Sequence, residues 1–137
     1  HTVRKHFNDV VDMIIDENEE LNSKPVLCVD FDGVLNDYRG YEEDNLYTPR
    51  YGSKSFMEKL NKKYKVIIHT ARPVQKVRDW LEEYDFKVFD VVNDKPPAFA
   101  YIDDRGINFN GSYKSVLKTL ENFEPYWEKD RVEVKLK

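Results

Sequence analysis

The sequence predicts an α/β fold in which short parallel strands alternate with amphipathic helices. The chain has 137 residues, a length typical of one domain, and we expect residues 1–137 to form a single unit. Segments with apolar residues at helical spacing alternate along it with short apolar runs. Residues 26–29, which follow a proline, are all apolar, as is typical of a strand in the middle of a parallel sheet.

The N-terminal half begins with an expected amphipathic helix within residues 1–24. Its apolar stripe comprises Val3, Phe7, Val10, Ile14 and Leu21. This stripe could pack on its own sheet or form a homodimer seam, so we expect a monomer or a homo-oligomer. After the first strand, residues 36–53 are polar and rich in aromatic residues, without a regular period. Ser55 and Glu58 then form a capping box that predicts a short helix.

The C-terminal half continues the alternation of strands and helices. The expected elements are a strand at 64–70, a helix from Pro73, strands at 87–92 and 99–102, a helix at 112–124 and an edge strand at 131–137. Proline suits the first turn of a helix. The helix at 112–124 has apolar side chains on one face, which we expect to face the core. The final segment alternates with period two, and its lysines are typical of an exposed edge.

Composition excludes several classes of protein. Lys and Arg total 22 against 26 Asp and Glu, a net charge of −4, so no global basic field attracts a polyanion. The only cysteine is Cys28, which rules out an internal disulfide framework and suits the reducing cytosol. No apolar run approaches the roughly 20 residues that cross a bilayer. No signal-peptide core is evident at the N-terminus. We therefore expect a cytoplasmic protein that does not enter a membrane.

Polar side chains follow three of the predicted strands at the point where each strand ends. These side chains are Asp30, Asp32, Thr70, Asp103 and Asp104, and Lys95 is expected nearby. Ligands of open α/β sheets bind outside the carboxyl ends of the strands, so we expect these residues to lie at one edge. Each has an ordinary alternative alone: a solvated strand end, a turn, a helix cap or a surface lysine. Together, and in this order, they indicate a functional site.

The chemistry of this group indicates a phosphate ester and a divalent cation. Four carboxylates in one place repel and do not all ionise unaided. Mg²⁺ relieves this repulsion and prefers carboxylates, waters and phosphate oxygens as ligands. Lys95 and Thr70 could hold phosphate oxygens. Asp30 and Asp32 flank one strand end, so one could attack while the other moves protons. Gly33 then permits a tight turn.

Residues 30–35, Asp-Phe-Asp-Gly-Val-Leu, resemble the first motif of the haloacid dehalogenase superfamily of aspartate-nucleophile phosphotransferases. Residues 67–72 resemble its second motif, a strand that ends in Ser or Thr. Lys95 resembles the third, and residues 101–104 resemble the fourth in its Asp-Asp form. The resemblance covers roughly residues 26 to 110, within an expected catalytic core at 26–124. It implies a three-layer Rossmann-like fold with helices on both faces of a mostly parallel sheet.

The resemblance also implies a mechanism. Asp30 attacks phosphorus and forms an aspartyl-phosphate, while Asp32 protonates the leaving group and then activates water. Mg²⁺ is held by the Asp30 carboxylate, the Asp32 backbone carbonyl and the pair Asp103 and Asp104. Thr70 and Lys95 hold the phosphoryl oxygens. An aspartate at position 32 is typical of the phosphatases of this superfamily.

The spacing of the motifs indicates a member without a cap domain. Lys95 precedes Asp103 by only eight residues, which is similar to the 5′(3′)-deoxyribonucleotidase branch. Residues 36–53 are too few for a folded cap, and residues 73–94 are occupied by one helix and one strand. We therefore expect residues 36–53 to act as a short flap.

Several residues near the motifs are expected to contact substrate. They are Gly33, Arg39, Tyr41, Ala71 and Arg72. Aromatic and arginine side chains of the flap could stack on a base or sugar and pair with phosphate. The alternative is an ordinary loop whose aromatic residues pack on the body. His69 is interpreted as a structural residue, and Arg105 either as a substrate contact or as an ion-pair partner.

The sequence thus predicts a Mg²⁺-dependent phosphomonoester hydrolase that acts on a nucleotide or another small phosphorylated metabolite. Acidic residues of the flap, at 42–44, disfavour a long polyanion. One alternative is a phosphatase of nucleic-acid ends or phosphoproteins. A second is a non-catalytic module that binds metal or phosphate for regulation. A response-regulator receiver is disfavoured because its adjacent acidic pair follows the first strand, whereas here it follows the last.

Overall fold

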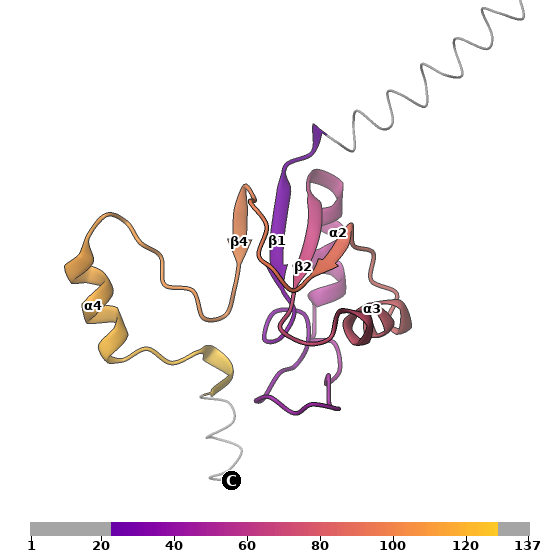
Figure 1. The fold of residues 1–137 in the computed structure, drawn as a ribbon, viewed down its shortest axis with the longest axis horizontal. Helices are drawn as coiled ribbons and strands as arrows, with labels where there is room; N and C mark the ends of the chain where they lie inside the picture. The colour runs from indigo at the N-terminus through magenta and orange to yellow at the C-terminus, as the bar shows by residue number, and fades with distance from the viewer. Residues whose placement is uncertain (1–22, 129–137) are drawn as a thin grey trace, which may run out of the picture.

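A computed structural model of the chain describes residues 23–128, and these form a four-stranded sheet with three helices (Figure 1). The elements in chain order are β1 (Val26–Asp30), α2 (Ser53–Lys63), β2 (Lys65–His69), α3 (Val74–Glu83), β3 (Asp90–Val92), β4 (Ala100–Ile102) and α4 (Tyr113–Glu121). The expected helix at 1–24 and edge strand at 131–137 lie essentially outside the described residues. None of the helices in the described part is long and apolar enough to cross a membrane.

The sheet has the order β3-β2-β1-β4, and every pair of neighbours is parallel. β1 therefore lies between β2 and β4, as its continuous apolar run predicts. The register pairs Asp30 with His69 and Val29 with Ile102, so the carboxyl ends of the three strands coincide. The predicted α/β fold with a parallel sheet is confirmed.

The core lies between one face of the sheet and helices α2 and α3. The buried residues of this cluster include Leu27, Val29, Val66 and Ile68 from the strands and Met57, Val77, Trp80 and Leu81 from the helices. These strand residues alternate along β1 and β2, so they share one face of the sheet. Right-handed crossovers that run in the same direction along a sheet place both helices on that face. The helical layer of the described residues is therefore on one side, whereas the resemblance implied helices on both faces of the sheet.

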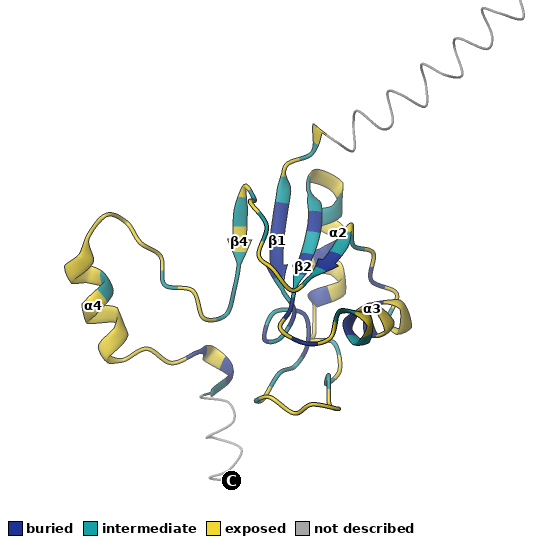
Figure 2. Ribbon diagram, viewed as in Figure 1, coloured by how far each residue is buried: buried dark blue, intermediate teal, exposed yellow. Residues whose placement is uncertain are grey.

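Helix α4 differs from its prediction. It has no buried residue, and its Leu117 and Leu120 are 65% and 53% exposed, so the expectation that they face the core is wrong (Figure 2). The chain leaves β4 through residues 103–112, forms α4 away from the sheet, and returns as a helical turn at 126–128 (Figure 1). This excursion is an arm that places α4 apart from its own sheet.

Helix α2 begins three residues earlier than its predicted capping box indicates. Its N-cap is Gly52, with φ of 86°, and no side chain caps the helix. Ser55 and Glu58 therefore lie within the helix instead of at its start.

The flap, residues 36–53, is closed by a bridge between two of its own residues and is tied to α3. Asn36 and Pro49 form an antiparallel bridge that closes its base. The indole of Trp80 on α3 donates a hydrogen bond to the carbonyl oxygen of Tyr47, at 2.8 Å. The flap is therefore an ordered loop packed on α3.

Candidate active site

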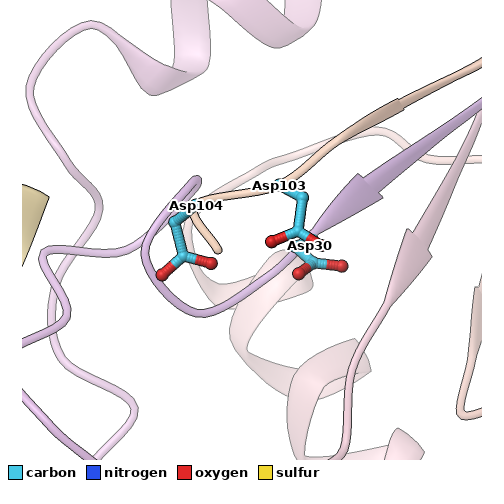
Figure 3. A group of neighbouring side chains, drawn as sticks. All are labelled: Asp30, Asp103 and Asp104. Atoms are coloured by element: carbon cyan, nitrogen blue, oxygen red, sulfur yellow. The ribbon is translucent and has the colours of Figure 1, made fainter. Parts of the chain in front are cut away.

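Three carboxylates meet at the carboxyl edge of the sheet, as Figure 3 shows. Asp30 ends β1, and Asp103 and Asp104 follow β4. One oxygen of each lies within 4.8 Å of the other two. This set of hard oxygen donors fits Mg²⁺, which favours carboxylates and is bound with additional water or phosphate oxygens. The residues present are therefore suited to the cation that the sequence predicts.

The three carboxylates differ in how firmly they hold a proton. Burial raises the pKa of Asp30 above its usual value, although a hydrogen bond with His69 opposes the rise. Burial likewise raises the pKa of Asp104. Burial also acts to raise the pKa of Asp103, but hydrogen bonds from the backbone N–H of Arg105 and from Lys95 lower it overall. A cation at this point would offset the cost of ionising the two carboxyls whose pKa is raised.

The side chain of Asp32 forms hydrogen bonds with residues outside the acidic cluster. Arg72 Nε donates to both of its oxygens, at 2.9 and 3.1 Å, and Asn36 Nδ2 donates to Oδ1 at 2.8 Å. Its carboxylate is not part of the group formed by Asp30, Asp103 and Asp104. A metal contact from Asp32 would use its backbone oxygen, as the resemblance implies.

Arg72 was expected to contact substrate, but the structure places it in the interior. Its relative exposure is 2%. It pairs with Asp32, donates from Nη1 to the carbonyl oxygen of Glu42 at 2.9 Å, and lies 5.0 Å from the ring centre of Tyr41. Arg72 is also absent from the lining of the cavity described below, so the structure gives no support to a direct contact between its side chain and substrate. Arg72 instead links Asp32 to the flap.

A cavity of about 160 Å³ opens beside the acidic cluster. Its lining comprises Asp30, Phe31, Asp32, Tyr38, His69, Thr70, Ala71, Asp104 and Arg105. Thr70 Oγ1 accepts a hydrogen bond from the backbone N–H of Arg72 at 3.0 Å, which leaves its own O–H to donate to a ligand. Asp30, Asp32 and Thr70 thus line the same small space.

The other expected residues lie outside this lining. Lys95 Nζ is 3.4 Å from Asp103 Oδ2, so it reaches the acidic cluster through that carboxylate. Arg39 forms an exposed ion pair with Asp37 at 3.6 Å. Tyr41 is 64% exposed on the flap. The cavity lining includes neither Arg39 nor Tyr41.

Gly33 lies in close contact with Asp104 of the acidic cluster. Its φ is 83°, in the left-handed region that favours glycine. A Cβ at this position would lie 2.3 Å from Oδ2 of Asp104. Residue 33 is therefore constrained both by its backbone and by the carboxylate beside it.

Comparison with known proteins gives one solved structure of similar fold. It is described as the conserved protein coded by locus from Bacteroides thetaiotaomicron, with a TM-score of 0.51 and 15% identity, over 78% of this chain and 98% of that chain. At this identity the similarity shows the fold alone. No protein-family model matches the sequence, and no curated protein matches it.

Sequence reasoning gave His69 a structural role, but it contacts the candidate nucleophile. Its Nε2 lies 3.1 Å from the carbonyl oxygen of Asn93, which can only accept, so Nε2 carries a proton. Its Nδ1 lies 3.0 Å from Asp30 Oδ1, and a hydrogen bond there needs a further proton on one of the two groups. The signal was available, because parallel pairing of the two strands places His69 beside Asp30.

Two aromatic residues near the end of the described chain were missed. Trp127 Nε1 donates to Asp104 Oδ2 at 2.6 Å, and the Tyr126 hydroxyl donates to the carbonyl oxygen of Gly33. No local pattern marks either residue, because their partners lie 23 and 93 positions away in the sequence.

Proposed function

We propose that this protein is a Mg²⁺-dependent phosphomonoesterase of the haloacid dehalogenase type, with Asp30 as its nucleophile. The observation that carries the proposal is the cavity in which Asp30, Asp32 and the hydroxyl of Thr70 converge beside Asp103 and Asp104. These five residues come from three strand ends, and their order along the chain matches the motifs that the sequence resembles.

Each side chain has a distinct task in the proposed reaction. An oxygen of Asp30 attacks phosphorus, and the bond from phosphorus to the ester oxygen breaks. Asp32, oriented by Arg72 and Asn36, transfers the proton that the departing alkoxide needs. It then takes a proton from the water that hydrolyses the aspartyl-phosphate, so that inorganic phosphate leaves and Asp30 is restored.

The remaining groups hold the phosphoryl oxygens and their charge. Thr70 donates a hydrogen bond to the phosphoryl group, and Lys95 supplies positive charge beside Asp103. Mg²⁺ held by Asp30, Asp103 and Asp104 would neutralise the charge of the transferred group. These groups would thus stabilise the charge that develops at phosphorus.

The size of the cavity supports a small phosphorylated substrate. A volume of about 160 Å³ admits a phosphoryl group, whereas sites that enclose a whole drug-sized ligand measure about 300–1,000 Å³. We therefore expect the leaving group to remain outside the cavity. Exposed acidic residues at 42–44 of the flap disfavour a long polyanion there. We favour a nucleotide or another small phosphate ester in the cytoplasm.

Hydrolysis of p-nitrophenyl phosphate tests the proposal. The assay compares wild type, Asp30→Asn and Asp37→Asn, each with Mg²⁺ and with EDTA. Asp37→Asn is the matched control because it makes the same change at a flap residue paired with Arg39. We expect Mg²⁺-dependent turnover in wild type and in the control, and its loss by several orders of magnitude in Asp30→Asn.

Two outcomes would contradict the proposal. Equal turnover in Asp30→Asn would remove Asp30 as the nucleophile. Mg²⁺ binding by wild type without turnover of this ester, or of a panel of nucleotides and sugar phosphates, would favour a non-catalytic metal-binding module.

A further inference from the structure

The end of the described chain returns to the acidic cluster and contacts it directly. Tyr126 and Trp127 belong to the turn at 126–128, which follows the arm that carries α4. The indole of Trp127 is 4% exposed and donates to Asp104 at 2.6 Å. The hydroxyl of Tyr126 donates to the carbonyl oxygen of Gly33. Two consecutive side chains thus hold the loop after β1 and the loop after β4.

Trp127 is fixed by more than its hydrogen bond. Its ring meets the edge of Tyr38, with ring centres 4.8 Å apart. The guanidinium of Arg105 lies 5.2 Å from its ring centre. On the neighbouring residue, the guanidinium of Arg50 lies 4.6 Å from the ring of Tyr126. Since several groups support the indole, its N–H has a defined direction toward Asp104.

The direction of the indole N–H determines the orientation of the Asp104 carboxylate. Oδ2 of Asp104 accepts from Trp127 and occupies the space that a side chain at Gly33 would fill. An indole N–H can only donate, so it interacts favourably with the ionised carboxylate. The hydrogen bond from Trp127 to Oδ2 restricts rotation of the Asp104 carboxylate, which lies next to Asp30 and Asp103. An oriented ligand loses less conformational freedom when it binds a cation.

We infer that Trp127 is a positioning residue for Asp104, so that the affinity of the acidic cluster for Mg²⁺ depends on the turn at 126–128. This inference rests on the proposed function only in requiring that the cluster bind the cation. Hydrogen-bond partners of metal ligands typically change metal affinity by about 10–100-fold when they are removed. Trp127 acts through Asp104 and does not itself contact substrate or metal.

Calorimetric titration with Mg²⁺ tests the inference on Trp127→Phe, which keeps an aromatic ring but removes the donor. Trp80→Phe is the matched control, since the Trp80 indole donates to the carbonyl oxygen of Tyr47 and not to a carboxylate of the acidic cluster. We expect Kd for Mg²⁺ to rise by about 10–100-fold in Trp127→Phe and to stay within about twofold of wild type in Trp80→Phe. In the phosphatase assay the concentration of Mg²⁺ that gives half-maximal rate should rise, while the rate at saturating Mg²⁺ changes less than the affinity does.

Fluorescence provides a second measurement that leaves Trp127 in place. The chain has two tryptophans, so Trp127 is the sole tryptophan in the Trp80→Phe variant, and excitation selective for tryptophan reports on it alone. Its emission should change on addition of Mg²⁺ with the midpoint that calorimetry gives. Adding Asp104→Asn should abolish that change.

The outcomes separate this inference from the proposed function. Equal Mg²⁺ affinity in Trp127→Phe and Trp80→Phe, or emission from Trp127 that ignores bound Mg²⁺, would overturn the positioning role even if turnover still required Asp30. Failure of wild type to bind Mg²⁺ would overturn both. Turnover that survives Asp30→Asn would overturn the proposed function alone.

Discussion

Replacement of Gly33 by alanine separates backbone strain from displacement of Asp104, a proposed metal ligand. Gly33 and Gly52 have nearly the same backbone angle, with φ of 83° and 86°. A Cβ on Gly33 would lie 2.3 Å from Asp104 Oδ2, whereas a Cβ on Gly52 would meet no atom within 4 Å. Gly52→Ala is therefore a control with the same strain and without the clash.

The two variants should differ in stability by the cost of that clash. A left-handed conformation costs an L-residue roughly 1–2 kcal/mol, and both variants incur this cost. In Gly33→Ala the carboxylate of Asp104 must also move, and overpacking of this kind costs about 1–3 kcal/mol more. For a chain of this length each kcal/mol lowers Tm by about 3–5 °C. We expect a fall of about 3–10 °C in Gly52→Ala and a larger fall in Gly33→Ala.

Metal binding gives the sharper comparison. Thermal unfolding in EDTA measures the stability difference, and calorimetric titration of the folded variants measures Mg²⁺ affinity. Gly33→Ala should bind Mg²⁺ at least about tenfold more weakly than wild type, because Asp104 can no longer hold its position, whereas Gly52→Ala should bind normally. Equal affinity in the two variants would refute the reasoning that Gly33 leaves space for a metal ligand.

Two further predictions concern charge. Arg72→Ala leaves the half-buried carboxylate of Asp32 without its guanidinium partner, and we expect the free energy of unfolding in urea to fall by about 3 kcal/mol. Adding Asp32→Asn should recover part of this loss. A loss below about 1 kcal/mol would contradict the prediction. Burial raises the pKa of Asp104 above 3.8. The metal-free native state therefore binds the proton of this carboxyl more tightly than the unfolded chain does. As a result, the free energy of unfolding falls as pH rises from 3.8 through the pKa of the native state. Asp104→Asn should therefore raise Tm in EDTA at neutral pH, with a gain that shrinks below pH 3.8; a gain independent of pH would contradict the assignment.

The parts of the site that sequence reasoning predicted are those determined by local pattern. Asp30 follows an apolar run that can only be a buried strand, and Asp103 follows another strand of the same sheet. Parallel pairing then brings the two together, whatever the loops between them do. The positions of these residues follow from the fold class.

The parts that it did not predict depend on contacts between distant segments. The amphipathic pattern of α4 indicated a helix but not its partner, and the arm keeps Leu117 in solvent. Arg72 resembles an exposed cation in the sequence, because nothing local shows that Asp32 and the carbonyl of Glu42 would bury it. Trp127 carries no mark at all, since its role comes from a hydrogen bond across 23 residues.

The hydrogen bond between Trp127 and Asp104 also has a consequence for the order of events during translation. The last strand of the described residues ends at Ile102, whereas the turn that holds Asp104 comes 25 residues later, at Trp127. Domains fold as the ribosome elongates the chain at about 5–20 residues per second, so this interval lasts roughly 1–5 s. For that time a nascent chain can have its strands assembled and its carboxylates adjacent but not yet clamped. Full affinity for the cation would thus be acquired only after Trp127 has been synthesised, later than the four strands of the sheet.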